Sequence, residues 1–291
     1  MSVPEYDRAN RQGARWNLSS NVLLMGVKLG IGIVGHSQAL IADGLHSGAD
    51  VFSSVAVVIG LAVSGRPPDR DHHYGHAKAE AISQKVVAVF LLLAGLEVAN
   101  TAISSFSRRG PVPSLLTLWI ALAAGAFKVI MMWTQRRLAK KTGSHGILAS
   151  AVDNQMDAVS SFVAAVGIGA SRMGYLSGDS VAALVVASLV MWGGVEIFRT
   201  AAIDLMDPAA DAETQEAIRK RVAMVAGVRS ISLLRTRVNG ALIFVDVEIE
   251  VDRHLTLLAA HDIAHRVDRS VCELSRVQGV TVHVNPMRED G

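Results

Sequence analysis

Six stretches of this chain are apolar over lengths that suit a lipid bilayer. The hydrocarbon core of a bilayer is about 30 Å thick, and an α-helix needs about 20 residues to cross it. Backbone polar groups cannot bond to water in lipid, so a spanning segment satisfies them internally by forming a helix. The region 17–205 is therefore predicted to be a membrane α-helical bundle of six transmembrane helices, at residues 17–35, 38–64, 79–106, 114–138, 146–172 and 179–203.

The basic residues of the short connecting segments predict the orientation of this bundle. If the N-terminus is cytoplasmic, the inner segments hold ten Lys and Arg residues and the outer ones hold three, Arg108, Arg109 and Arg172. Residues 1–16 are charged and lack the apolar core of a cleavable signal, so we expect a cytoplasmic leader. The chain is thus predicted to be a multi-pass integral protein of the plasma or inner membrane, or of a membrane derived from it. Both termini are expected in the cytoplasm.

Residues 208–291 differ in composition and are predicted to fold outside the membrane. Helical periodicity marks 212–225 and 256–273, and strand patterns mark 227–237, 242–251 and 277–284. Along 242–251 apolar and polar residues alternate, as in a sheet with one buried face. Asn239-Gly240 is a strong signal for a hairpin turn before this strand. The order αββαβ predicts a small α+β domain, and dimer formation would support its modest core.

Two pairs of ionisable residues lie inside the apolar stretches, His46 with Asp50 and Asp153 with Asp157. An ionisable group in hydrocarbon costs roughly 3 kcal/mol on insertion scales, so it normally faces a cavity, a partner or an ion. A spacing of four residues puts both members of a pair on one helix face. Two such faces turned toward each other supply the ligands of one divalent-cation site. Asp43 shares the face of His46 and is expected beside this site or at the mouth of the ion path.

The donor atoms of these four residues narrow the choice of ion. One imidazole and three carboxylates without sulfur suit borderline to hard divalent ions, with Fe²⁺ and Zn²⁺ as first candidates and Mn²⁺ and Co²⁺ as further ones. Metal ligands must be deprotonated, so binding should displace protons. His46 is best suited to carry them, because imidazole titrates near neutrality. The competing interpretation, that these groups only hold helices together, leaves several charges in lipid without compensation.

A second metal site is predicted in the loop after the second apolar stretch. Asp69, His72 and His76 lie within eight residues of the segment PDRDHHYGH. Their side chains can converge on one ion. The alternative is an ordinary solvated polar loop.

The C-terminal region holds further candidate ligands. Asp246 and Glu248 alternate with apolar residues and so share one strand face, while His261 and His283 lie in the helix and strand that follow. Together they predict a third metal site, at a dimer interface. The alternative is that these are ordinary surface residues, as single surface histidines usually are.

The chain lacks the sequence signatures of several other function classes. The chain has no G-x-x-x-x-G-K-[ST] loop for a nucleotide and no H-E-x-x-H for a metalloprotease. The G-x-G-D context of an intramembrane aspartyl protease is also missing. A single cysteine, Cys272, excludes an internal disulfide framework and a thiolate cage. With a net charge of +2 and 5% aromatic residues, no stacking surface for nucleic acid is expected. We therefore expect no enzyme activity, no bound nucleotide and no nucleic-acid partner.

Several motifs resemble those of the cation diffusion facilitator family over nearly the whole chain. They are ADGLHSGAD, HHYGHAKAE, DNQMD, and LMD followed by LRTR. The resemblance implies six membrane spans and a cytoplasmic ferredoxin-like domain for dimerisation and regulation, in a homodimer that works in the lipid bilayer. The first and third motifs are also similar to the iron/zinc branch, including magnetosome-associated members.

The resemblance also implies roles for residues by their position. The four residues inside the apolar stretches would form the transport site: His46, Asp50, Asp153 and Asp157. The three loop residues Asp69, His72 and His76 would form a second metal site. Lys78 and Asp207 would form a salt bridge that interlocks the membrane and cytoplasmic parts. In the C-terminal domain, His261 and His283 match metal-binding positions, and Asp246 matches a ligand of magnetosome-type members.

The predicted function is efflux of a divalent cation by alternating access, with protons as the counter-ion. The rival from another class is a membrane metal sensor or scaffold, which would use the same sites to set its conformation and recruit partners. Metal flux distinguishes the two.

Overall fold

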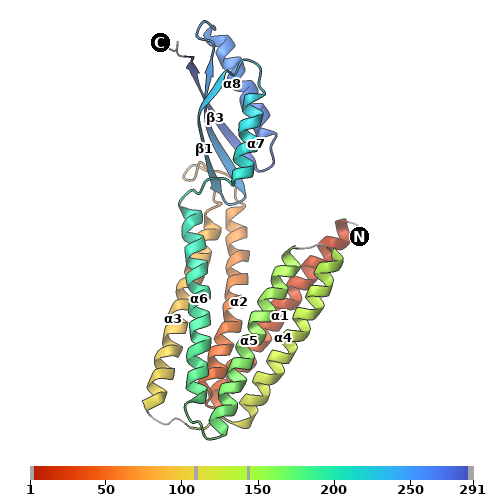
Figure 1. Ribbon diagram of the computed structural model, residues 1–291, viewed down its shortest axis with the longest axis vertical. Helices are drawn as coiled ribbons and strands as arrows, with labels where there is room; N and C mark the ends of the chain where they lie inside the picture. The colour runs from red at the N-terminus through yellow and green to blue at the C-terminus, as the bar shows by residue number, and fades with distance from the viewer. Residues whose placement is uncertain (1–2, 108–110, 143–144, 288–291) are drawn as a thin grey trace. The chain divides into compact units, whose positions relative to one another are not determined.

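A computed structural model of the protein describes residues 3–107, 111–142 and 145–287 (Figure 1). Arg108 and Arg109, used above to predict the orientation, and the last four residues of the predicted C-terminal domain lie outside this described part. The chain divides into two compact units, which we treat separately. The helical unit consists of Met1–Val58 and Gln84–Phe198, and the loop-domain unit consists of Ile59–Ser83 and Arg199–Gly291.

Six long helices follow one another along the chain. They are α1 (Val3–Val34), α2 (Gln38–Ser64), α3 (Ala79–Ser107), α4 (Leu115–Thr142), α5 (His145–Arg172) and α6 (Gly178–Leu205). Among the described residues, five of these helices are long and apolar enough to cross a membrane, and α5 is the exception. α5 is 28 residues long, as are α4 and α6, but the polar run from Asp153 to Asp157 lowers its mean hydropathy. The predicted fold class, a membrane-type helical bundle followed by a small sheet domain, is confirmed.

The first helix begins earlier than the apolar pattern indicates. α1 starts at Val3 and runs for 32 residues, so the helix includes most of the segment that was expected to lead into the first span. Extending an existing helix adds a hydrogen bond for each residue without a new nucleation step. The polar segment therefore continues the helix of the apolar segment.

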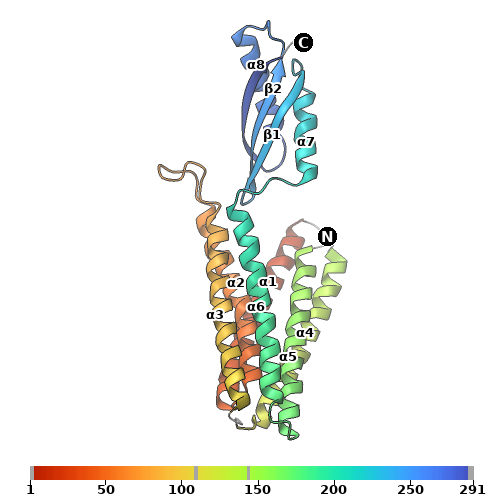
Figure 2. The same ribbon diagram turned by 60° about the vertical axis from the view of Figure 1, so that its left-hand side comes forward.

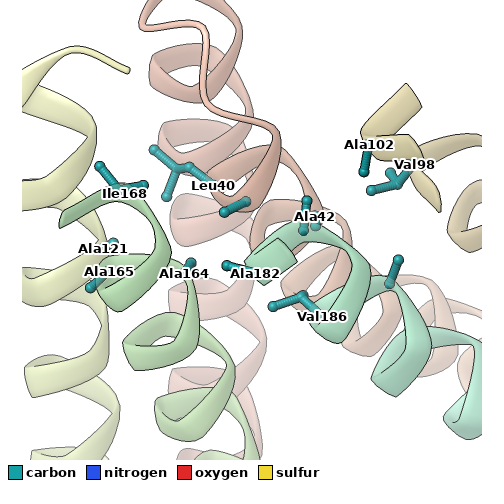
Figure 3. Packing of buried hydrophobic residues seen from close by; sticks show 13 residues of the cluster. Leu40, Ala42, Val98, Ala102, Ala121, Ala164, Ala165, Ile168, Ala182 and Val186 are labelled. Atoms are coloured by element: carbon teal, nitrogen blue, oxygen red, sulfur yellow. The ribbon is translucent and has the colours of Figure 1, made fainter. Parts of the chain in front are cut away.

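The helices of the helical unit pack together closely at one end. A cluster rich in alanine joins α2, α3, α4, α5 and α6 there (Figure 3); its labelled members are Leu40, Ala42, Val98, Ala102, Ala121, Ala164, Ala165, Ile168, Ala182 and Val186. Small side chains let membrane helices approach closely. Further along, a smaller cluster of Ala56, Val87, Leu91 and Val190 joins only α2, α3 and α6. Figures 1 and 2 accordingly show α1, α4 and α5 leaning away from the other three helices.

Asp179 connects α6 to the start of α2 at the closely packed end. Its carboxylate accepts hydrogen bonds from Oγ of Ser37 at 2.6 Å and from the backbone N–H groups of Gln38 and Ala39 at 2.7 and 3.4 Å. The first N–H groups of a helix have no partner within it, and negative charge is favoured there. Asp179 therefore caps a helix other than its own and fixes α2 just before Asp43.

The C-terminal domain has the predicted order of elements. It consists of α7 (Ala212–Ala223), β1 (Ser230–Asn239), β2 (Leu242–Val251), α8 (Leu257–Cys272) and β3 (Val277–Pro286). β2 is central, antiparallel to β1 and parallel to β3. Both helices cover one face of the sheet (Figures 1 and 2). The apolar residues of β2 are buried on that face, which confirms the predicted alternation: Ile243, Val245, Val247, Ile249 and Val251.

The hairpin turn lies one residue later than predicted. Asn239 pairs with Leu242, so the turn consists of Gly240 and Ala241 rather than Asn239 and Gly240. Gly240 has a φ of +60°, the value that the first central residue of a type II′ turn adopts and that favours glycine. Asn239 instead ends β1, and its side-chain amide donates to the backbone carbonyl of Tyr74 at 3.3 Å.

Candidate metal sites

A glycine lets α1 approach α2 closely along the segment of α2 that carries His46 and Asp50. A Cβ added at Gly44 would lie 2.9 Å from the side chain of Leu29, so only glycine permits this contact without a shift. Because the helices touch here, a polar side chain of α1 reaches a predicted ligand of α2. The amide of Asn21 donates to Oδ2 of Asp50 at 3.1 Å.

His46, Asp50 and Asp157 come together between α2 and α5. Nε2 of His46 lies 3.4 Å from Oδ1 of Asp157, and the carboxyl of Asp50 interacts electrostatically with that of Asp157. Nδ1 of His46 is buried and has no hydrogen-bond partner among the described residues. Asp153, one turn before Asp157, is exposed and interacts with it through its charge. The structure therefore gathers three of the four predicted ligands and places Asp153 at their edge.

A lysine that the sequence analysis missed lies among these ligands. Lys128 of α4 is fully buried, and its Nζ lies 2.6 Å from Oδ2 of Asp157. The same ammonium donates to Oδ1 of Asn154 at 3.0 Å and to Oδ1 of Asn21. The signal was present in the apolar run GAFKVIMMW, because a lysine inside a membrane span needs a buried partner as much as an aspartate does.

A second buried ion pair lies nearer the closely packed end of the helical unit. Nζ of Lys28 lies 2.8 Å from Oδ2 of Asp43 and donates to Oγ of Ser47 and of Ser161 at 2.9 and 3.0 Å. Ser160 and Ser161 donate to the two carboxylate oxygens of Asp43 at 2.7 and 2.8 Å. Both charged side chains are fully buried. Asp43, expected beside the metal site or at the mouth of the ion path, is thus neutralised by a lysine of α1.

The loop after α2 brings Asp69, His72 and His76 together. Among the described residues, this is the only group of three or more candidate ligands whose ligand atoms all lie within 4.8 Å of one another. Oδ1 of Asp69 lies 3.3 Å from Nδ1 of His72, and Oδ2 lies 3.3 Å from Nε2 of His76. Gly75, with a φ of +80°, supplies the positive-φ turn that precedes His76. His76 therefore faces the cluster through Nε2, while Nδ1 on the other side of its ring is buried without a hydrogen-bond partner in the described part of the chain.

We expect the loop site to bind one divalent ion with an affinity that falls as the pH drops. The backbone N–H of His72 donates to Asp69 and lowers the pKa of that carboxyl, so it stays charged in neutral and weakly acidic solution. A histidine ligates only as the neutral imidazole, and imidazole generally titrates near pH 6.5. The affinity is therefore expected to be lower at pH 5 than at pH 7, because protons compete with the ion for the imidazole ligands while Asp69 stays charged.

Calorimetric titration of the full chain at pH 7 and pH 5 measures this effect. Asp69→Asn is expected to weaken the loop site at least about tenfold, because it removes a ligand, and even outer-shell changes cost this much. Asp71→Asn, an acid of the same loop outside the cluster, is the matched control. An affinity that is the same at both pH values would exclude histidine ligation.

The structure brings Lys78 and Asp207 together, as the resemblance implied. Nζ of Lys78 lies 2.9 Å from Oδ1 of Asp207. The loop also contacts the sheet of the same unit, where the rings of Tyr74 and Phe244 meet edge to face at 5.5 Å and the guanidinium of Arg237 lies 4.3 Å from the Tyr74 ring. Both charged groups of the salt bridge are more than a third exposed, so it contributes little stability by itself, and the aromatic contacts hold the loop on the sheet.

The predicted ligands of the C-terminal domain lie on two different surfaces. Glu248 of β2 is in register with His283 of β3, and Asp246 shares their side of the sheet. His261 is exposed on α8, which packs against the opposite, apolar side. These four residues do not converge within one chain, so one ion that bound all of them would need a second copy of the domain.

Comparison with known families gives matches for both parts of the chain. Residues 16–206 match the cation efflux transmembrane domain, and residues 210–287 match the cytoplasmic domain of cation efflux proteins.

Individual relatives match over similar lengths. The manganese efflux system protein MneS of Bacillus subtilis is 33% identical over 290 residues, which cover 99% of this chain and 100% of the relative. The magnetosome protein MamM of Paramagnetospirillum magneticum is 35% identical over 269 residues, which cover 91% of this chain and 85% of the relative. Among solved structures, the C-terminal domain of MamM in a nickel form is 30% identical; it covers 27% of this chain and 100% of its own length, with a TM-score of 0.26.

Proposed function

Because the chain belongs to the cation efflux family, whose members are membrane transporters rather than enzymes, we propose that it exports a divalent metal ion from the cytoplasm in exchange for protons. The observation that carries this proposal is the cluster of His46, Asp50 and Asp157 inside the helical unit. Ionisable groups gathered between membrane helices mark an ion path by default. Asp153 at the edge of the cluster adds a third carboxylate for an arriving ion.

The two helix groups of the helical unit provide a means of alternating access. His46 and Asp50 lie on α2, whereas Asp157 lies on α5. α2 packs with α3 and α6 through the smaller cluster, and α5 belongs to the group that leans away (Figure 1). A rigid movement of one group against the other would change the distances between ligands and open the site to the other side of the membrane.

We propose Mn²⁺ as the first ion to test. Carboxylate oxygens suit Mn²⁺, and an imidazole is compatible with it. MneS, named for manganese efflux, matches nearly the whole chain. Fe²⁺ and Zn²⁺, which the sequence motifs favour, and Co²⁺ are the competing ions in the same assay.

Proton exchange follows from the chemistry of the ligands. Carboxylate and imidazole groups release protons before they bind a metal ion. His46 is the proposed proton carrier, because its imidazole touches Asp157 and keeps a buried nitrogen without a partner in the described part of the chain. Protons that return from the outer side would compete for the same groups and help to expel the ion.

We further propose that the protein works as a homodimer with both termini in the cytoplasm. The segment 210–287 matches the cytoplasmic domain of cation efflux proteins, and the excess of basic residues in the inner segments agrees with that orientation. A metal site shared by His261 and the ligands on the sheet would require the pairing of two C-terminal domains, because these residues do not converge within one chain.

Flux measurements in proteoliposomes test the proposed function. We expect Mn²⁺ uptake into vesicles with an acidic lumen, coupled to proton release and reported by metal-sensitive and pH-sensitive dyes. Fe²⁺, Zn²⁺ and Co²⁺ are compared at the same concentration. Absence of flux for every ion, with metal binding retained in calorimetry, would contradict transport and favour a membrane sensor or scaffold.

A further inference from the structure

Lys128 places a positive charge inside the proposed transport site. Its ammonium contacts three oxygen atoms, Oδ2 of Asp157 at 2.6 Å, Oδ1 of Asn154 at 3.0 Å and Oδ1 of Asn21. The side chain is fully buried, and the other carboxylate oxygen of Asp157 faces His46. The ammonium therefore holds an oxygen atom that a bound metal ion would use.

The charges around this ammonium match a divalent ion. Once Asp50, Asp153 and Asp157 have released their protons, they bring three carboxylates and Lys128 brings one ammonium, so the site that receives the ion has a net charge of minus two when the imidazole is neutral. Without the lysine the same ligands would carry minus three. Because charges interact strongly in a buried site, this difference changes the affinity for a divalent ion.

We propose that Lys128 is a tethered cation that occupies the Asp157 side of the unloaded transport site and sets the affinity for the divalent substrate. This inference rests on the proposed function. The arriving ion displaces the ammonium from Asp157, while Asn21 and Asn154 keep it close by and charged. A transport site must bind its ion firmly enough to load it and weakly enough to release it. Lys128 weakens binding and thereby favours release.

The other buried lysine differs in the partners that it contacts. Lys28 lies against Asp43, Ser47 and Ser161, and none of these is a predicted ligand of the transport site. Its three ammonium donors are all used within this group. Lys28 is therefore a buried lysine that contacts no predicted ligand of the transport site. Substitution of Lys28 together with Asp43 provides the control for the Lys128 variants.

Metal binding by variants of the full chain tests the proposal. Lys128→Gln and Lys128→Met remove the charge, and Lys128→Arg keeps it, all with the loop site weakened by Asp69→Asn so that its binding is resolved from that of the transport site. In calorimetric titrations with Mn²⁺, both neutral variants are expected to bind at least about tenfold more tightly than the parent, and the Arg variant within about threefold of it. In proteoliposomes the neutral variants should show a lower KM and a lower kcat, because release slows. The charge-neutral double variant Lys28→Met/Asp43→Asn should leave the Mn²⁺ affinity unchanged.

Equal or weaker Mn²⁺ binding by a neutral variant that elutes as a folded species overturns the proposal. A measurement on the unaltered lysine does not depend on how the variants fold. The nitrogen NMR signal of the Lys128 ammonium is expected to shift when diamagnetic Cd²⁺ fills the site, and an unchanged signal at saturation also overturns the proposal.

Failure of the proposed function would look different. If the protein does not transport metal, wild-type flux is absent while the effect of Lys128 on binding persists. If only the role of Lys128 is wrong, wild-type flux is normal and the neutral variants bind Mn²⁺ as the parent does.

Discussion

Asp50→Asn is expected to reduce metal flux to the level of protein-free liposomes while the protein stays folded. The hydrogen bond that Asp50 accepts from the amide of Asn21 has a neutral donor, and an asparagine keeps an oxygen atom for it. The substitution therefore preserves size and this contact but removes one carboxylate ligand. Flux in proteoliposomes, together with elution of the purified variant as a single species, measures both parts of the expectation.

Asp157 should behave differently from Asp50, although both belong to the same cluster. Asp157 compensates the buried ammonium of Lys128, and a buried charge left without its partner costs about 3–5 kcal/mol. Asp157→Asn is thus expected to lose both flux and thermal stability, whereas Asp50→Asn loses flux alone. Asp204→Asn, the same chemical change at an exposed position near the end of α6, should leave flux unchanged. Normal flux in the Asp50→Asn protein would remove this residue from the transport site.

Local patterns in the sequence were sufficient to predict most of the fold. Apolar length marks the long helices, and the alternation along β2 marks its buried face, because each signal depends only on neighbours in the chain. The limits of elements were less certain. The polar residues after Val3 continue α1 although they carry no apolar pattern, and the centre of the hairpin turn is Gly240 and Ala241 rather than Asn239 and Gly240.

The partners of buried charges depend on which helices pack together, and local sequence patterns carry no information about that packing. Lys128 and Asn21 are 107 residues apart, and Asp43 and Ser160 are 117 apart. The spacing of Asp43 three residues before His46 predicts a place beside the metal site or at the mouth of the ion path, but it does not reveal the pairing of Asp43 with Lys28 of another helix. The lesson is that every lysine within an apolar run needs a carboxylate partner, and that this partner is either a residue outside the metal site, as for Lys28, or one of its ligands, as for Lys128.

Breaking the buried pair of Lys28 and Asp43 from one side is expected to destabilise the helical unit strongly. Lys28→Met would leave the carboxylate with serine hydroxyls as its hydrogen-bond donors, and Asp43→Asn would leave the ammonium without a negative charge. Removal of one partner of a fully buried ion pair costs about 3–5 kcal/mol. The free energy of unfolding in mixed detergent micelles, measured for both single variants, tests this expectation.

The double variant Lys28→Met/Asp43→Asn should recover most of that loss, because no uncompensated charge remains in it. The coupling energy from the double-mutant cycle is the decisive quantity, and losses that simply add would contradict a direct pairing. Asp43 follows Leu40 and Ala42 of the alanine-rich cluster, and the pair with its serines joins α1, α2 and α5. Full flux in a stable double variant would assign this pair to the fold alone, whereas lost flux with normal Mn²⁺ affinity would show that ion release also requires it.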